Sequence, residues 1–302
     1  MLGKQSSLAA ECFAGGYIGA DFDIHEDLSG RLPTEWREFN RELIPVYLAK
    51  HPGKSKISAG LACGALWTVA KGISVGDIVL SPDGRGNYRV GEVQGDYYYL
   101  PGPTLPHRRN VRWFDRQIPR ASMSNALQGS TGSSGTISFL GSHVQELERL
   151  IGQGAETLVQ SATTQEVDDP LAFAMEKHLE DFLVANWTST ELGREFEIWS
   201  EDGELKGQQY RTDTGPIDIL AVSKDRKRLL VIELKRGRAS DPVVGQILRY
   251  MGYVGEVLAE DGQAVEGAVI ALEDDPKLQR ALQAISHVRF YRYKLHFSLA
   301  KV

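Results

Sequence analysis

The sequence has few cysteines, no long hydrophobic run and no excess of basic residues. Its only cysteines, Cys12 and Cys63, lack the CxxC spacing of a metal or redox site. Isolated cysteines of this kind are typical of buried thiols, and they favour the reducing cytoplasm over an oxidising compartment. No stretch approaches the roughly 20 apolar residues that cross a bilayer, and no apolar core follows Met1 as in a signal peptide. These absences argue against a membrane or secreted protein.

The formal net charge of −6 does not by itself favour nucleic acid as a partner. Binding to phosphates depends on where the cations lie, however, and a nuclease gathers carboxylates at its metal site. The charge balance therefore neither supports nor excludes DNA. The 302 residues are 42% hydrophobic and 25% charged, which is typical of a globular protein, and this length favours two domains.

The N-terminal part, residues 1–140, is rich in glycine, aromatic residues and short alternating runs. Many short strands at close spacing are typical of a small β-barrel, here accompanied by helices. Residues 141–169 are expected to form a helix followed by a polar linker. We expect a helix over 35–50, a turn over 82–87, and strands over 16–24, 66–70, 77–80, 88–93, 96–100 and 110–114.

From Pro170 onwards the pattern changes to α/β, so the second domain is expected over residues 170–302. A mixed sheet flanked by helices is the predicted architecture. The expected helices are 171–186, 240–257 and 277–284, and the expected strands are 195–199, 217–222, 229–235, 267–272 and 287–299, with a turn at 223–227.

The strand around residue 233 combines charged and apolar residues in an unusual way. Because a strand alternates faces, Glu233 and Lys235 point to one side, whereas Ile232 and Leu234 point to the other. Burying such charges is costly unless they are paired or bound to a metal. Taken alone, Glu-x-Lys favours a surface salt bridge on an edge strand.

Asp218 interrupts another hydrophobic strand, and the short turn that follows makes this strand the antiparallel partner of the Glu233 strand. The two carboxylates can then share a divalent cation such as Mg²⁺, which prefers oxygen ligands. Such an ion stabilises charge on a scissile phosphate and activates the attacking water, while Lys235 orients that water or neutralises the phosphate. Gln246 and Tyr250 are one turn apart on the next helix, and so on one face.

In this order, Asp218, Glu233-x-Lys235 and Gln246-x-x-x-Tyr250 resemble the PD-(D/E)XK nuclease superfamily. The wider string over about residues 172–255 resembles its NucS-like and RecB-like branches. One departure is that Pro216 precedes Ile217 instead of standing directly before Asp218. The resemblance implies a restriction-endonuclease-like core that hydrolyses phosphodiesters with Mg²⁺ or Mn²⁺.

The resemblance also implies that an acidic residue on the first helix approaches the metal. Glu176 and Glu180 are four residues apart on one helix face, and Glu176 is favoured as the ligand; alternatively, both are solvated helix charges. Arg194 and Arg236 are candidate phosphate contacts together with Tyr250, since the arginine fork suits phosphate oxygens. The alternative for both arginines is an ordinary place on the surface.

The N-terminal part resembles PUA-superfamily barrels of the EVE and YTH type, through Gly76-Asp-Ile-Val-Leu80, Tyr88-x-Val-Gly-Glu-Val93 and His107-Arg-Arg-Asn-Val-Arg-Trp113. The resemblance implies an aromatic-lined cavity that holds a base turned out of the stack. Because most aromatic residues must belong to the core, only about two of them are expected to line it. The candidates are Tyr17, Trp67, Tyr97, Tyr98, Tyr99 and Trp113, with Asp21 as a hydrogen-bond acceptor.

The stretch 107–120 holds five arginines against one acid, Asp115. Arg108, Arg109 and Arg112 are therefore candidate phosphate contacts, although a solvated charged loop is the alternative.

The leading hypothesis is a modification-dependent, type IV-like restriction endonuclease that reads a modified base in DNA and cuts as a homodimer. The first alternative is a repair endonuclease acting on mismatched or branched DNA. The second is a nucleic-acid-binding protein, which could bind RNA, with an inactive nuclease fold.

Overall fold

The chain forms two units, Met1–Val167 and Asp168–Val302, and each is described by itself. The computed structural model describes residues 2–3, 6–102, 104–132, 137–152, 179–240, 242–273 and 276–294. Within this part of the chain, no helix is long and apolar enough to cross a membrane.

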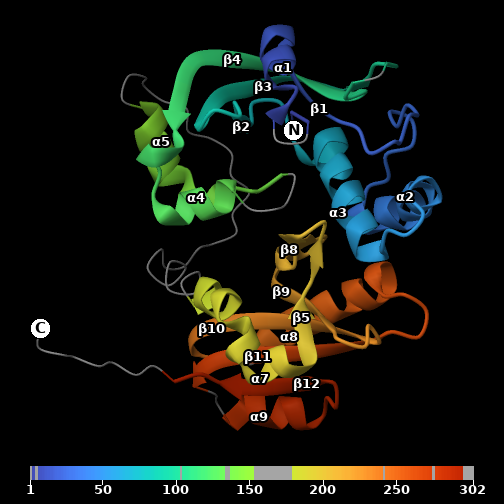
Figure 1. Cartoon of the computed structure of the whole chain (residues 1–302), viewed down its shortest axis with the longest axis vertical. Coiled ribbons are helices and arrows are strands. Elements are labelled where there is room, and N and C mark those ends of the chain that lie inside the picture. Colours follow the sequence, from blue (N-terminus) through green and yellow to red (C-terminus); the bar gives the residue numbers. More distant parts are fainter. Residues whose placement is uncertain are drawn as a thin grey trace, which may run out of the picture. The chain divides into compact units, whose positions relative to one another are not determined.

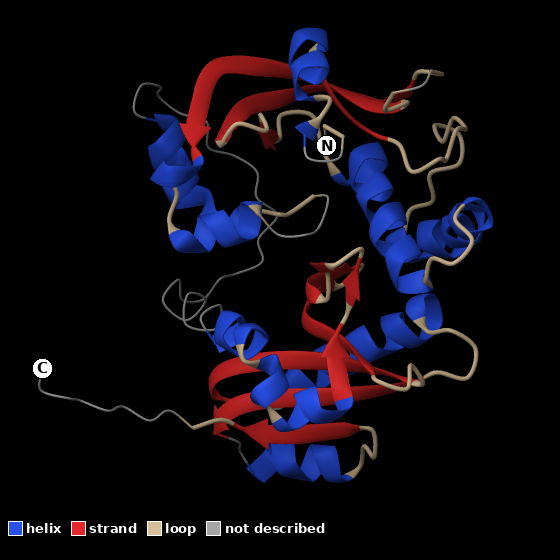
Figure 2. Cartoon of the chain, in the orientation of Figure 1, coloured by secondary structure: helices blue, strands red, loops and turns tan. Residues whose placement is uncertain are grey.

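The first unit is built on a four-stranded antiparallel sheet in the order β1-β4-β3-β2 (Figure 2). β1 and β2 are its edge strands, so the described strands form an open sheet. Such a sheet is compatible with one half of the small β-barrel predicted from the strand spacing. The expected strands at 88–93 and 96–100 are parts of one long strand, whose ladder with β4 shifts register between Val93 and Tyr97. The strands are β1 (Tyr17–Ala20), β2 (Ile78–Pro82), β3 (Asn87–Tyr99) and β4 (His107–Pro119).

Three helices of this unit, α1, α4 and α5, pack in two apolar clusters on the sheet. Cys12 of α1 packs with Tyr17, Val93 and Val111, and the thiols of both Cys12 and Cys63 are free and buried as expected. Leu127 of α4 and Leu147 of α5 pack on the other ends of β3 and β4. The helices are α1 (Ala9–Gly15), α2 (Trp36–Lys50), α3 (Lys56–Trp67), α4 (Asn125–Thr131) and α5 (Val144–Gly152).

The strand expected at 66–70 is wrong, because this segment is helical. α3 begins after Ser55, whose side chain accepts a hydrogen bond from Ser58 N, and a π-helical turn at Thr68–Gly72 continues it. A short apolar run does not distinguish a buried helix from a buried strand by its periodicity. Close packing against α2 explains the small residues here, since a Cβ on Gly64 would lie 2.4 Å from the Trp36 ring.

The second unit has the expected mixed sheet, in the order β12-β11-β10-β9-β5, and β8 also pairs with β9 (Figure 1). β10, β11 and β12 run parallel, whereas β9 is antiparallel to β10, β8 and β5. A small hairpin, β6 (Ser200–Glu201) and β7 (Glu204–Leu205), stands apart from this sheet. The other strands are β5 (Phe196–Ile198), β8 (Gln208–Thr212), β9 (Gly215–Ser223), β10 (Arg228–Arg238), β11 (Ala264–Glu273) and β12 (Val288–Arg292).

Helices cover both faces of this sheet. Trp187, Leu192 and the helical residues 179–185 pack on the face that contains Ile232 and Leu234. α8 (Pro242–Tyr253) covers the other face, where a Cβ on Gly267 of β11 would lie 2.7 Å from Met251 Sδ. Two further described α-helices of this unit are α7 (Glu191–Glu195) and α9 (Pro276–Gln283). The start of the helix expected at 171 lies outside the described residues.

Candidate active site

The β9–β10 hairpin opens where its two acidic residues meet. The backbone ladder runs from Leu229 opposite Val222 to Ile232 opposite Ile219. Just beyond this ladder, Leu234 N donates a hydrogen bond to Asp218 Oδ2 (2.7 Å). The carboxylate of Asp218 thus takes a backbone donor of β10 at the point where the ladder ends. This contact confirms the predicted pairing of the Asp218 and Glu233 strands.

Glu233 is a buried charge on an interior strand. Its exposed fraction is only 2%, because β10 lies between β9 and β11. Lys235, on the same face, donates from Nζ to Glu233 Oε1 over 2.8 Å and keeps part of its side chain exposed. The pair therefore differs from a surface salt bridge on an edge strand, since the acid is enclosed while the amine reaches solvent.

Asp218 is buried beside two other acidic residues, Glu180 and Glu233. Burial raises the pKa of this carboxyl well above its usual value, and the negative charges of Glu233 and Glu180 raise it further. The hydrogen bond from Leu234 N and the charge of Lys235 oppose this rise without cancelling it. A carboxylate in such a place favours either a proton or another cation.

Glu180 is the acid of the first helix that the structure places at this site, buried with 3% of its surface exposed. Gln209 Nε2 donates to Glu180 Oε2 and to Asp218 Oδ1 (3.2 Å), and Gln208 Nε2 donates to Glu180 Oε1 (2.6 Å). Glu180 is therefore not the solvated helix charge that was the alternative. Glu176 lies outside the described residues. The sequence analysis did not identify the two glutamines, because neutral amides carry no charge that would indicate a metal site.

Tyr250 and Gln246 of α8 lie at the same face of the hairpin. Gln246 Nε2 donates to the Tyr250 hydroxyl over 3.3 Å, as their spacing predicts. Burial raises the pKa of Tyr250, and the negative charges of Glu233 and Asp218 also raise it. At the start of β9, Gly215 approaches this hydroxyl so closely that a Cβ would lie 3.0 Å from it.

Gly215→Ala is expected to destabilise the protein and disturb the site. Gly215 has φ +123°, so alanine there would be strained, and its Cβ would press on Tyr250. We expect a loss of about 1–3 kcal/mol in the free energy of unfolding, measured with denaturant. Gly262→Ala is the control, because Gly262 has φ +83° but no atom within 4 Å of a Cβ. Equal losses in both variants would contradict the contact with Tyr250.

The residues at this site fit a hard divalent cation. Asp218 and Glu233 supply carboxylate oxygens, which Mg²⁺ and Mn²⁺ prefer, and burial together with the nearby charges of Glu233 and Glu180 raises the pKa of Asp218. Another group of candidate ligands lies in the first unit, where atoms of Asp21, Asp23 and His25 are within 4.8 Å of one another. Asp21 contacts His25 and the backbone of its own loop, Asp23 pairs with His51, and two of the three candidate ligands are exposed.

Among the described side chains, the candidate phosphate contact Arg194 makes no hydrogen bond or ion pair with this cluster. Arg194 lies exposed on the short helix α7. The side chain of Arg236 lies outside the described part of the chain. Both remain predictions.

The aromatic residues expected to form a base pocket in the first unit are spread over several environments. Tyr17 is buried under Arg108, Trp67 packs on Phe39, and Trp113 packs on Phe13 while its indole donates to Cys12 O (3.2 Å). Tyr99 packs against His107. Asp21 accepts hydrogen bonds within its own loop. These residues do not form one cavity, because most of them fill the core or hold a loop.

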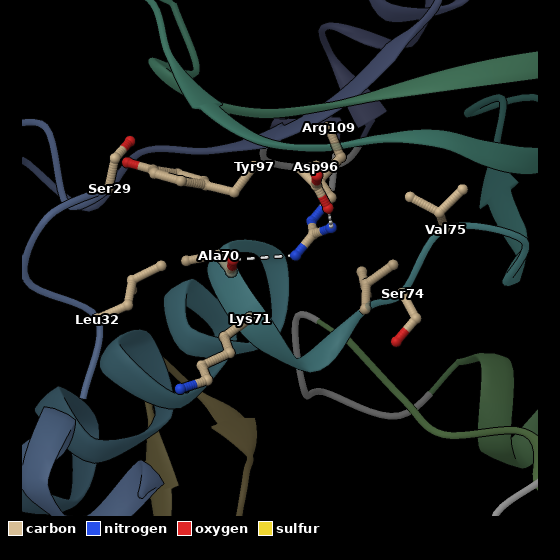
Figure 3. A pocket seen from close by; sticks show the side chains of 10 residues that line it. Ser29, Leu32, Ala70, Lys71, Ser74, Val75, Asp96, Tyr97 and Arg109 are labelled. Atoms are coloured by element: carbon tan, nitrogen blue, oxygen red, sulfur yellow. Dashed lines mark hydrogen bonds and ion pairs between the residues drawn. The ribbon is translucent and has the colours of Figure 1, made fainter. Parts of the chain in front are cut away.

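A pocket of about 490 Å³ does occur in this unit, with Tyr97 at its wall (Figure 3). The Tyr97 hydroxyl donates to His107 Nδ1 over 2.9 Å, and His107 Nε2 donates to Ile24 O over 2.6 Å. These bonds fit a neutral imidazole, the form that burial favours by lowering the pKa of His107. The other lining residues include Ser29, Leu32, Lys71, Asp96 and Arg109.

Arg109 and Arg108 are not the exposed phosphate contacts that the sequence suggested. The buried Arg109 guanidinium donates to Val69 O (2.7 Å) and Ala70 O (2.9 Å), so it ties β4 to the π-helical turn. Arg108 donates to Leu105 O and Thr104 O and lies over the Tyr17 ring. Arg112 remains exposed but pairs with Glu92.

Two parts of the sequence match known protein families. Residues 190–286 match the family described as the endonuclease NucS C-terminal domain, and this range contains the Asp218, Glu233 and Lys235 cluster. The second unit has a NucS-like nuclease core. This match supports a DNA endonuclease. Residues 1–140 match a family described as a domain of unknown function, DUF8426. No curated protein matches the sequence.

Three solved structures are similar to the chain at low scores. They are a repair endonuclease from Pyrococcus abyssi (16% identity, TM-score 0.32, covering 72% of this chain and 65% of that one), an EndoMS–dsDNA complex (16%, 0.31, 72% and 64%) and EndoMS in apo form (15%, 0.31, 73% and 66%). The chain thus spans just under two thirds of their length. TM-scores this low do not establish a common fold.

Proposed function

We propose that the protein is a metal-dependent DNA endonuclease whose second unit hydrolyses phosphodiester bonds with Mg²⁺ or Mn²⁺. The observation that carries this proposal is the meeting of Asp218 with the buried Glu233–Lys235 pair where the hairpin opens. A divalent ion bound by Asp218 and Glu233 would neutralise charge on the scissile phosphate and lower the pKa of the attacking water.

The chain's own residues prepare this site before any substrate arrives. Leu234 N fixes one oxygen of Asp218, and Gln209 fixes the other. Glu233 holds Lys235 by its ammonium group, so that the amine stays at the edge of the site and partly exposed. From there Lys235 can donate a hydrogen bond to a phosphate oxygen or to the attacking water.

The first unit would supply the choice of substrate, by reading a modified base as in a type IV-like restriction endonuclease. Its pocket supports this proposal, since about 490 Å³ lies within the range of small-ligand sites. Tyr97 offers an aromatic face, while Asp96 and Lys71 offer an acceptor and a cation at the same opening. Cutting both strands would require two cores, and hence a homodimer on DNA.

Repair of mismatched or branched DNA is the second candidate. The match to the NucS C-terminal domain favours this function at least as well as restriction. An inactive nuclease fold that only binds nucleic acid has less support, because the buried Glu233 would then lower the stability of the protein without contributing to catalysis.

Incubation with a panel of DNA duplexes and Mg²⁺ distinguishes these functions. The panel contains unmodified, methylated, hydroxymethylated, mismatched and branched DNA, and we expect cleavage of modified DNA to exceed that of unmodified DNA. Preferential cleavage of mismatched or branched DNA would support a function in DNA repair instead of restriction. Absence of cleavage on every duplex with Mg²⁺ or Mn²⁺ would contradict the nuclease proposal.

The Val75→Trp variant tests whether the pocket determines which DNA is cleaved. Val75 lines the pocket and is 57% exposed, so the larger side chain can fill the opening without entering the core. We expect the preference for modified DNA to disappear while basal nicking with Mn²⁺ persists. Leu100→Trp is the control, because Leu100 is also exposed (47%) but does not line the pocket.

A further inference from the structure

Two consecutive glutamines of β8 reach the same carboxylate. Successive side chains of a regular strand point to opposite faces, so Gln208 and Gln209 should diverge. Gln209 has φ +50°, a left-handed conformation that breaks this alternation. As a result, Gln208 Nε2 donates to Glu180 Oε1 and Gln209 Nε2 donates to Glu180 Oε2. Positive φ is uncommon for a residue such as glutamine and is retained where surrounding contacts hold it, often at functional sites.

Gln209 also connects Glu180 to Asp218. Its amide nitrogen carries two hydrogens, and it donates one to Glu180 Oε2 and one to Asp218 Oδ1 (3.2 Å). Leu234 N binds the other oxygen of Asp218. Asp218 is therefore held from β8 on one side and from β10 on the other, while Glu180 anchors the amide from the helix 179–185.

A neutral amide has a specific advantage between two acids. It satisfies both carboxylates by hydrogen bonds but adds no positive charge, so the negative potential that attracts a cation remains. A lysine or arginine in its place would neutralise that potential. The bridge also fixes the orientation of Asp218 before a metal binds, which lowers the entropic cost of forming the site.

We propose that Gln209 is a positioning residue, which orients Asp218 for metal binding by bridging it to Glu180. This inference rests on the proposed function, because it takes Asp218 as a metal ligand. Gln209 itself acts through Asp218. Gln208 differs from Gln209 in one respect: it donates to Glu180 and to Asp181 Oδ1 (2.9 Å) but makes no hydrogen bond with Asp218.

Titration of the full-length protein with Mn²⁺ in the absence of DNA, with free Mn²⁺ followed by electron paramagnetic resonance, tests this inference. Gln209→Gly removes the amide and suits the left-handed backbone, so the fold should be preserved. We expect its Mn²⁺ affinity to fall by about 10- to 100-fold, as for other partners of metal ligands. Gln208→Ala should lose less. Gln263→Ala, which removes a glutamine bonded to Arg226 O in a surface turn, should bind as the wild type does.

An unchanged or tighter Mn²⁺ affinity in folded Gln209→Gly would overturn the inference, and so would an equal loss in Gln208→Ala. Circular dichroism and thermal unfolding establish that each variant is folded. Gln209→Ala, which lacks the amide but keeps a Cβ, should show the same loss as Gln209→Gly. Asp218→Asn separates the two proposals: if it keeps wild-type affinity, the metal site itself is wrong, whereas if it alone loses binding, only the role of Gln209 falls.

Discussion

Asp218→Asn is expected to abolish cleavage and, at the same time, to make the metal-free protein more stable. The loss of activity should reach about three orders of magnitude, the upper range for removing one group that stabilises the transition state. Asparagine keeps the shape and removes repulsion from Glu233 and Glu180, although its amide nitrogen cannot accept one of the two hydrogen bonds that Asp218 accepts. We expect the relief of repulsion to exceed the loss of that hydrogen bond. Such a trade between stability and activity is common at catalytic sites. Thermal unfolding in EDTA and cleavage in Mg²⁺ measure the two effects.

The stability difference should depend on pH with a defined sign. The pKa of Asp218 in the folded protein is raised above its usual 3.8, so folded protein binds this proton more tightly than unfolded protein. Without metal, wild-type stability is therefore lost as the pH rises from about 4 through the raised pKa. Asp218→Asn should lack this loss, so its advantage grows with pH. An advantage that shrinks with rising pH, or is absent at pH 7, would contradict the electrostatics.

Lys235→Met should separate metal binding from catalysis. Methionine preserves much of the side-chain length but removes the ammonium that donates to Glu233 Oε1. Cleavage should fall by about 100- to 1000-fold, the usual effect of losing a donor to the transition state. Mn²⁺ affinity should be equal or tighter, because a positive charge beside Glu233 has been removed. A variant that loses Mn²⁺ binding and cleavage together would show that Lys235 shapes the metal site rather than the reaction.

The core of the site could be predicted because its geometry is local. Strand alternation puts Glu233 and Lys235 on one face, and a five-residue turn makes the Asp218 strand their partner. The i, i+4 spacing of Gln246 and Tyr250 likewise needs only a helix. None of these inferences requires knowledge of distant contacts.

The rest depends on distant contacts or on local departures from regular structure. No sequence feature indicates the left-handed backbone of Gln209. The role of Gln209 and its hydrogen bond to Glu180 could therefore not be predicted. The apolar segment 66–70 is compatible with either a strand or a helix. In the structure it is helical, and Gly64 just before it packs under the Trp36 ring. Arg109 looked like a surface cation, but backbone carbonyls of the π-helical turn bind it inside the first unit.

Anomalous diffraction from crystals soaked in Mn²⁺ tests the central claim most directly. An ion bound at the opened end of the β9–β10 hairpin would give a peak within bonding distance of carboxylate oxygens from both Asp218 and Glu233. The same soak of Asp218→Asn should lose this peak. A peak only at Asp21, Asp23 and His25 of the first unit, or a peak that survives in Asp218→Asn, would contradict the claim.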